Sequence, residues 1–226
     1  MDLFKICFMR QSIIIIRNKI IGFCYKNFLK RIFFSIDPEK VHDRMVYVGH
    51  TLGKNIITRK ITAGLFSYSK KKLEQDILGI HFSNPIGLAA GFDKNAELTD
   101  ILPAVGFGFA EVGSITGEPC LGNPKPRLWR LKESKSLVVY YGLKNPGCEA
   151  VAAKLADKKF QIPIGVSIAK TNCPATVDME AGVKDYVKAY KTMSSIGSYT
   201  TVNISCPNAF GGQPFTDKKS LEYLLN

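Results

Sequence analysis

The sequence predicts an α/β fold in which parallel strands alternate with helices. Three observations lead to this fold class: short apolar runs rich in β-branched residues, helical patterns between them, and polar or glycine-rich clusters where the runs end. This texture begins at Ile77 and continues to Asn226. Units of this kind form a parallel sheet with right-handed crossovers, either as a closed barrel or as an open doubly wound sheet.

Four strands and three helices are expected in this region. The strands are predicted at 86–90, 109–112, 164–168 and 200–204, and the helices at 98–105, 149–156 and 181–193. Each strand is followed by a polar cluster, and four such ends on one face fit a (β/α)8 TIM barrel better than a Rossmann crevice, which uses two loops. The GxGxxG fingerprint of a Rossmann fold is also missing from the sequence. The candidate site therefore lies where the four strands end.

The N-terminal region has a different composition. Residues 1–34 carry seven Lys and Arg residues against Asp2 alone, which is half of the net charge of +12. Arg17 and Lys19 interrupt the apolar run before it reaches the ~20 residues that a membrane-spanning helix needs. We expect a helix that lies on a membrane surface, with its cations on anionic headgroups and its aromatic residues in the acyl boundary. A helix packed on its own domain and a targeting segment are the alternatives.

Three regions are expected along the chain. Asp37, Pro38 and Glu39 have the pattern of a helix start, so a second helix should run to about Leu52. Residues 1–52 would then be the helical, membrane-associated region. Residues 53–76 are polar and basic without a strong period and are expected to be a connector. Residues 77–226 would form the first half of the barrel.

Composition argues against metal and nucleic-acid sites. The six cysteines are scattered without a CxxC pair, and only three histidines could join them as ligands, so we expect reduced thiols and no metal. The net positive charge alone would suit nucleic acid. No recognisable nucleic-acid module is present, and the aromatic residues lie in apolar stripes, so we expect no nucleic-acid partner.

The last predicted strand ends in the most informative cluster. It delivers Asn203, Cys206 and Asn208 at its carboxyl end, and Pro207 stops the strand there. Cys206 should therefore sit on a turn where a thiol can meet a substrate, between two side-chain amides. This combination suggests a base between two anchors, and a buried inert thiol is the alternative.

The first predicted strand is followed by a second cluster with binding potential. Gly91 allows the backbone to approach a flat ring or a phosphate closely, and Lys94 supplies a cation for a carboxylate. Taken alone, a lysine after a strand is more often a solvated loop residue.

Three motifs resemble the dihydroorotate dehydrogenase family, specifically its membrane-associated, quinone-linked class 2. They are NPIGLAAGFDKN at 84–95, GFGFAEVGSIT at 106–116 and GNPKPR at 122–127, in the order and spacing of the family. The resemblance runs from about Ile36 to the chain end. It implies an FMN enzyme of pyrimidine biosynthesis that oxidises (S)-dihydroorotate to orotate and passes electrons to a quinone. It also implies a peripheral location on the cytoplasmic face of the cell membrane, with the N-terminal helices forming a tunnel to the flavin.

The resemblance also implies roles for individual residues. Ala90, Gly91, Phe92, Asp93, Lys94, Ser114 and Asn203 would bind FMN; Lys94, Gly142, Leu143, Asn203 and Asn208 would bind the substrate; and Cys206 would be the catalytic base. The chemistry of the reaction explains why these residue types are needed. The reaction removes a proton from a ring carbon next to a carbonyl and a hydride from the neighbouring carbon, so it needs a base on one substrate face and flavin on the other.

Some residues depart from the class 2 pattern. Class 2 usually has serine at the base position, and the segments 142–147 and 205–208 look like the soluble class 1 branch. Val139, or Tyr140 if the alignment shifts by one residue, stands where the family usually has a substrate-contacting asparagine. Ser167 stands where class 2 has an asparagine that touches FMN. A class 1-like enzyme with a soluble acceptor is therefore an alternative.

Length is the largest departure. The sequence ends after the fourth predicted strand and its loop, whereas a TIM barrel has eight strands. We expect the chain to be part of a longer gene product, because half a barrel exposes strand edges and apolar faces. A membrane-surface binding module, or an inactive fragment derived from the family, is the alternative to an enzyme.

Overall fold

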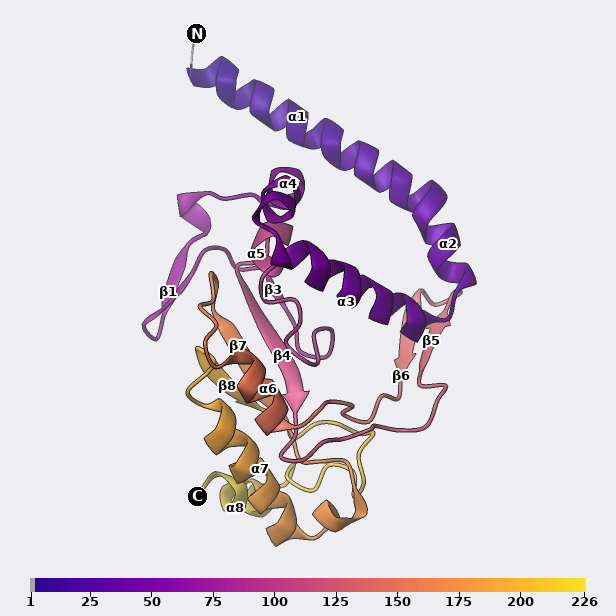
Figure 1. Ribbon diagram of the computed structural model, residues 1–226, viewed down its shortest axis with the longest axis vertical. Helices are drawn as coiled ribbons and strands as arrows, with labels where there is room; N and C mark the ends of the chain where they lie inside the picture. The colour runs from indigo at the N-terminus through magenta and orange to yellow at the C-terminus, as the bar shows by residue number, and fades with distance from the viewer. Residues whose placement is uncertain (1–2) are drawn as a thin grey trace. The chain divides into compact units, whose positions relative to one another are not determined.

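The computed structural model describes the backbone of residues 3–226 and the side chains from Ser12 onward (Figure 1). The chain divides into two compact units, Met1–Met45 and Val46–Asn226. The first contains the helical N-terminal region, and the second contains the parallel sheet.

The first unit is helical, as predicted. Helix α1 (Leu3–Cys24) continues through a π-helical turn, η1 (Tyr25–Leu29), into α2 (Lys30–Ser35). Helix α3 (Pro38–Lys54) begins where expected, because the Asp37 carboxylate accepts the backbone N–H of Lys40 at 3.0 Å and so caps the first turn. Among the described residues, none of the helices is both long enough and apolar enough to cross a bilayer.

The segment 53–76 is not a simple connector, which corrects the prediction. It contains α4 (Ile56–Phe66) and a short 3₁₀ turn, η2 (Lys71–Leu73). Asn55 caps α4 by accepting the backbone N–H of Ile57 at 2.7 Å. The helix buries none of its residues completely, and Ile56, Ile57 and Ile61 are all exposed. Without a buried face the segment has no clear apolar period, which is why the pattern did not predict a helix.

The predicted parallel sheet is confirmed. Its strands are β3 (Gly87–Leu88), β4 (Phe109–Ile115), β7 (Ile164–Ile168) and β8 (Tyr199–Val202). They are parallel throughout, in the order β3-β4-β7-β8. All four carboxyl ends therefore lie at one edge of the sheet, where the candidate site was expected.

The predicted helices of this region are present with shifted bounds. They are α5 (Leu102–Val105), α6 (Cys148–Leu155) and α7 (Met179–Met193). Helix α5 is shorter than expected because Pro103 stands in its first turn and Gly106 ends it in the left-handed conformation. Helices α6 and α7 pack on each other, and α7 packs on β7 (Figure 1).

Several elements were not predicted. They are the hairpin β1 (Gln75–Ile77) and β2 (Ile80–Phe82), the hairpin β5 (Leu128–Leu131) and β6 (Ser136–Val139), the 3₁₀ turn η3 (Pro174–Val177), and α8 (Lys218–Leu225). The β6 strand is fully exposed and β1 is exposed as well. β2 and β5 alternate between half-buried and exposed residues, but over only three and four residues, which is too short for periodicity to identify a strand.

The core lies between the sheet and its helices. Every residue of β7 is buried, as expected of a strand covered on both faces, and this includes the polar Ser167. Val112 of β4 and Val166 of β7 are fully enclosed, and so are Val151 of α6 and Met193 of α7. Packing of this kind fixes the sheet and, through it, the loops at its carboxyl edge.

Leu155→Ala should destabilise the second unit by about 2–5 kcal/mol, because it leaves a cavity beneath α6 where Leu155 is 1% exposed. The measurement is urea denaturation followed by circular dichroism. Ala153→Ser on the exposed face of the same helix is the control and should change stability by no more than about 0.5 kcal/mol. Equal losses in the two variants would show that α6 does not contribute to the core.

Candidate active site

The loop that follows β3 is joined to the end of β4 by backbone hydrogen bonds. Gly91 donates its N–H to the Gly113 carbonyl at 2.8 Å, and Gly113 donates its own N–H to the Asp93 carbonyl at 3.1 Å. Both glycines have positive φ angles, near 98° and 108°. A side chain on Gly113 would strike the Ser167 carbonyl, so glycine is required there.

Three strand ends meet at the hydroxyl of Ser114. Asn203, just after β8, donates an amide N–H to Ser114 Oγ at 2.8 Å. Ser167 of β7 shares a hydrogen bond of 2.8 Å with the same Ser114 oxygen. Ser167 is buried, whereas Ser114 and Asn203 are half-buried. Ser167 thus supports Ser114 from behind, and Ser114 and Asn203 remain partly open to a ligand.

Asp93 has a structural task within the first loop. Its carboxylate accepts the backbone N–H groups of Glu97 and Leu98, both at 2.8 Å, and the residue is 1% exposed. Burial raises the pKa of Asp93, and these two hydrogen bonds oppose the rise. The carboxylate therefore shapes the loop that carries Lys94. Any part of Asp93 in a ligand site would come from its backbone.

Lys94 lies over an aromatic ring that sequence reasoning did not single out. Its ammonium is 4.1 Å from the centre of the Tyr141 ring, and the Arg127 guanidinium is 5.1 Å from the same centre. Tyr141 directly precedes Gly142 and Leu143. The contact between Lys94 and the Tyr141 ring therefore joins the loop after β3 to the predicted substrate-binding segment. Arg127 is buried and donates to the carbonyls of Leu121 and Asn123, both at 3.0 Å.

A chain of asparagines connects the remaining loops. Asn208 donates to the Val139 carbonyl at 2.9 Å, and its own carbonyl accepts from Asn123 at 2.9 Å. Asn172, after β7, donates to Asn123 Oδ1 at 3.0 Å and accepts the Phe210 N–H at 2.7 Å. Asn123 and Asn172 were missed as site residues. Asn172 lies in a polar cluster at a strand end, which was the available signal.

Cys206 lines a small cavity of about 10 Å³ at the end of β8. Asn203, Lys170, Tyr186 and Phe215 line it as well. The Tyr186 hydroxyl donates to the Asn203 carbonyl at 2.7 Å, and burial raises the pKa of Tyr186 to about 12, so the phenol stays protonated at neutral pH. Cys206 is half-buried and its thiol is free. The lysine that shares its cavity is Lys170, not Lys94.

The other described cysteines are also free thiols: Cys24, Cys120, Cys148 and Cys173. Cys7 lies outside the described side chains. Cys120 and Cys148 are buried, and their thiols donate to the carbonyls of Gly142 and Gly117, at 3.4 and 3.2 Å. These two thiols serve the packing of the loops.

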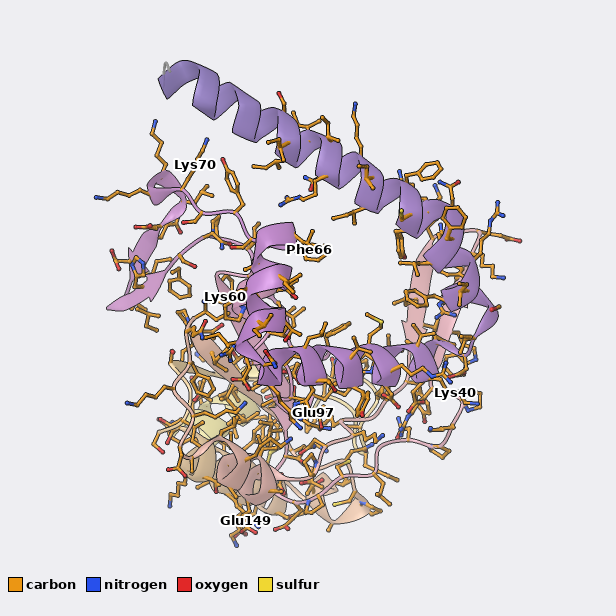
Figure 2. All side chains as sticks on the ribbon, turned by 45° about the horizontal axis from the view of Figure 1, so that its top comes forward. Lys40, Lys60, Phe66, Lys70, Glu97 and Glu149 are labelled. Carbon is orange, nitrogen blue, oxygen red and sulfur yellow. The ribbon has the colours of Figure 1, made fainter. Side chains whose placement is uncertain are left out.

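A second hollow, of about 250 Å³, lies beside α4. It is lined by Ile56, Arg59, Lys60 and Ala63 of α4 and by Asp100, Pro103, Ala104 and Gln161, all within the second unit. Lys60 is labelled on α4 in Figure 2. The hollow has both apolar and basic walls, a mixture that suits an amphiphilic ligand.

The sheet and its loops define the class of protein. Four parallel strands with polar side chains from every carboxyl end form about half of a TIM barrel, and enzymes with this fold keep their chemistry at that edge. A sequence model of the family described as dihydroorotate dehydrogenase matches residues 72–226. The chain belongs to the dihydroorotate dehydrogenase family.

Individual relatives agree with this assignment. The chain is 38% identical over 200 residues to dihydroorotate dehydrogenase (quinone) of Natronomonas pharaonis, covering 87% of this chain and 55% of that protein. It is 36% identical over 199 residues to the protein of the same name from Roseiflexus sp., covering 88% and 54%. The chain thus spans about half the length of the curated relatives it matches. The quinone-linked names bear out the resemblance to class 2.

Solved structures show the same fold. The dihydroorotate dehydrogenase of Eimeria tenella, crystallised with ferulenol, superposes with a TM-score of 0.69 at 30% identity, over 84% of this chain and 49% of that one. Its ligand-free form gives a TM-score of 0.66 at 31% identity, over 84% and 52%. The barrel prediction is confirmed, with this chain covering about half of it.

Gly142→Ala should break the asparagine chain. Gly142 has a φ of 65°, and an added Cβ would lie 2.5–2.7 Å from the side chain of Asn123. Gly212→Ala is the matched control, because Gly212 has a φ of 64° but open space around it. Both variants should lose about 1–2 kcal/mol from backbone strain. Gly142→Ala should lose about 1–3 kcal/mol more in urea denaturation, as hydrogen bonds of Asn123 are given up. Equal losses of stability in the two variants would show that a Cβ at position 142 does not disturb Asn123.

Proposed function

We propose that this chain supplies the FMN, substrate and quinone-facing parts of an enzyme that oxidises (S)-dihydroorotate to orotate with quinone as the acceptor. The observation that carries the proposal is the loop after β8, which places Asn203 against Ser114 and Cys206 in the adjoining cavity. A family match over residues 72–226 and the quinone-linked relatives support it.

The residues at the strand ends fit a flavin. Gly91 is exposed, and a side-chain carbon built on it would meet nothing within 4 Å, which leaves room for a flat ring or a phosphate beside the backbone. Ser114 and Asn203 offer a hydroxyl and an amide, and Lys94 offers a cation, which together suit the carbonyls and ring nitrogens of an isoalloxazine. When bound, FMN supplies the acceptor for the hydride. The predicted contributions of Ala90 and Phe92 belong to the same proposal.

The substrate would lie between this flavin site and the loop after β8. Asn203 and Asn208 would bind the amide and carbonyl groups of its ring, and Lys94 its carboxylate. Asn208 already donates to the Val139 carbonyl at 2.9 Å, which orients its side chain next to the Gly142–Leu143 segment. Cys206 would take the proton from the ring carbon next to the carbonyl, because a thiol ionises at neutral pH far more readily than a serine hydroxyl does.

The N-terminal helices would bring the enzyme to the lipid that holds its quinone. Exposed apolar side chains line the first unit at Ile13, Ile15, Ile16, Ile20, Phe23, Phe28 and Ile32. Basic residues stand among them, and the described helices up to Ser35 contain no acidic residue. This composition suits binding at an anionic bilayer surface. The hollow beside α4 is the proposed entry for the quinone.

The enzyme proposal is tested by flavin reduction. The chain is purified alone and also co-expressed with the part of the Roseiflexus relative that the alignment leaves uncovered. Anaerobic addition of dihydroorotate should bleach the absorbance of bound FMN in the co-expressed assembly. Bound flavin that dihydroorotate leaves unbleached would favour a binding module without turnover. Failure of both samples to bind FMN would overturn the proposal.

Cys206→Ser should slow dihydroorotate-dependent flavin reduction by about 10²-fold or more at neutral pH, because a hydroxyl is much harder to deprotonate than a thiol. The rate should recover in part as the pH is raised. Cys206→Ala is the control and should lose the rate without recovering it. The measurement is stopped-flow absorbance across pH. If the rate of Cys206→Ser depends on pH in the same way as that of the unmodified protein, Cys206 is not the base.

Replacing Lys26, Lys30 and Arg31 by glutamine should weaken binding to vesicles that contain phosphatidylserine by about 10²-fold, since each cation near an anionic surface contributes about 1 kcal/mol. The matched control replaces Lys70, Lys71 and Lys72, which removes the same charge outside the helical arm. The measurement is vesicle sedimentation. Equal losses in both triple variants would show a net-charge effect and no defined membrane surface.

A further inference from the structure

A buried lysine lines the same cavity as Cys206 and has no role in the proposed reaction. Lys170 directly follows Ala169 at the end of β7 and is 3% exposed. Lysine is almost never buried to this degree unless it is paired, since its charge must leave water. A side-chain carbon on Gly182 of α7 would lie 3.7 Å from Lys170 Cδ, so the aliphatic stem runs along this helix.

The ammonium of Lys170 reaches into the loop that carries Cys206. Lys170 Nζ donates to the Phe210 carbonyl at 2.5 Å, a contact between residues 40 positions apart. Phe210 is also fixed by Asn172, which accepts its N–H at 2.7 Å. Lys170 and Asn172, which both follow β7, therefore hold the turn that follows β8. Lys170 and Cys206 line one cavity.

The charged and titratable groups around Lys170 come from three elements. Cys173 lies in its own loop, Asp185 and Tyr186 on α7, and Cys206 after β8. Burial lowers the pKa of Lys170, and negative charge on Cys173, Asp185 or Cys206 raises it. The Asp185 carboxylate is already bonded to the Thr171 N–H at 2.7 Å, the Thr171 hydroxyl at 2.8 Å and the Gly117 N–H at 3.2 Å. The Tyr186 phenol stays neutral at physiological pH.

We propose that Lys170 is a positioning residue that tethers the Cys206–Phe210 turn and supplies the positive charge opposite the Cys206 thiolate. The inference deepens the proposed function, since it rests on Cys206 being the base. An ammonium carries three donors, and the Phe210 carbonyl takes one of them. Lys94 is less suited to this role, because its ammonium lies over the Tyr141 ring. In this role Lys170 would act through Cys206 and would contact neither the substrate nor the flavin.

The test measures the reactivity of the Cys206 thiol with iodoacetamide in the full 226-residue chain. Peptide mass spectrometry gives the alkylation rate of each cysteine between neutral and alkaline pH, so neither FMN nor turnover is needed. Lys170→Met keeps the stem and removes the charge, and Lys170→Arg keeps the charge. The exposed thiol of Cys24 is the internal control.

Lys170→Met should slow alkylation of Cys206 about tenfold at neutral pH and move the midpoint of its pH dependence upward. Lys170→Arg should retain most of the native rate, and Cys24 should react alike in all three proteins. A tether alone would give a different result, because a loosened turn exposes the thiol and raises the rate at alkaline pH without moving the midpoint. Either that result or an unchanged pH dependence of Cys206 alkylation in a folded Lys170→Met protein would overturn the proposal that Lys170 supplies a charge to Cys206. A chain whose Cys206 alkylation responds as expected but which never reduces flavin would disprove the enzyme proposal alone.

Discussion

The hydroxyl of Ser114 is the point on which the arrangement of the site depends. It stands at the end of β4 and is hydrogen-bonded to Ser167 of β7 and to Asn203 after β8, so three neighbouring strands converge on one oxygen. A hydroxyl can donate once and accept twice, and this capacity lets a single side chain join two partners. The parallel register of β4, β7 and β8 brings these side chains to the same edge. Without that register, the loop after β8 would have no fixed position relative to the first two loops.

A second layer of hydrogen bonds holds the loops themselves. The asparagines at 123, 172 and 208 bond to one another and to backbone groups, and Asn145 is buried while bonded to Thr116 and Gly147. Amides suit this task because each carries donors and acceptors without a charge that would have to be desolvated. The loops have little regular structure. Side-chain amides therefore make the hydrogen bonds to polar backbone groups that a ladder of backbone hydrogen bonds makes within a sheet. A rigid site can therefore be built from irregular segments.

The sequence predicted what depends on burial and missed what depends on local capping or on tertiary contact. The strand 164–168 was found with its observed bounds, since Ile164, Val166 and Ile168 form a short β-branched pattern that ends before the polar cluster at 170–172. Helix α4 was missed because its isoleucines are exposed and give no apolar period, although Asn55 caps it. Lys170 was not singled out, since a lysine after a strand is usually solvated and only the fold shows that Gly182 and Phe210 enclose it. Cys206 and Asn203 were predicted as site residues from their residue types at a strand end and from the family resemblance, and both line one cavity. Their roles stay predictions.

The two departures from the family pattern have different physical consequences. Val139 meets Asn208 through its backbone carbonyl, and its side chain is 49% exposed, so the contact to Asn208 does not require any particular side chain at 139. A side-chain contact that an asparagine would make at that place has no counterpart in Val139. Ser167 is too short and too buried to extend outward. Instead, Ser167 is hydrogen-bonded to Ser114 and fixes the direction of the Ser114 hydroxyl. Ser114 can then offer its remaining hydrogen-bonding capacity to a ligand. The shorter side chain is thus compatible with a flavin site in which Ser114 makes the contact and Ser167 fixes its direction.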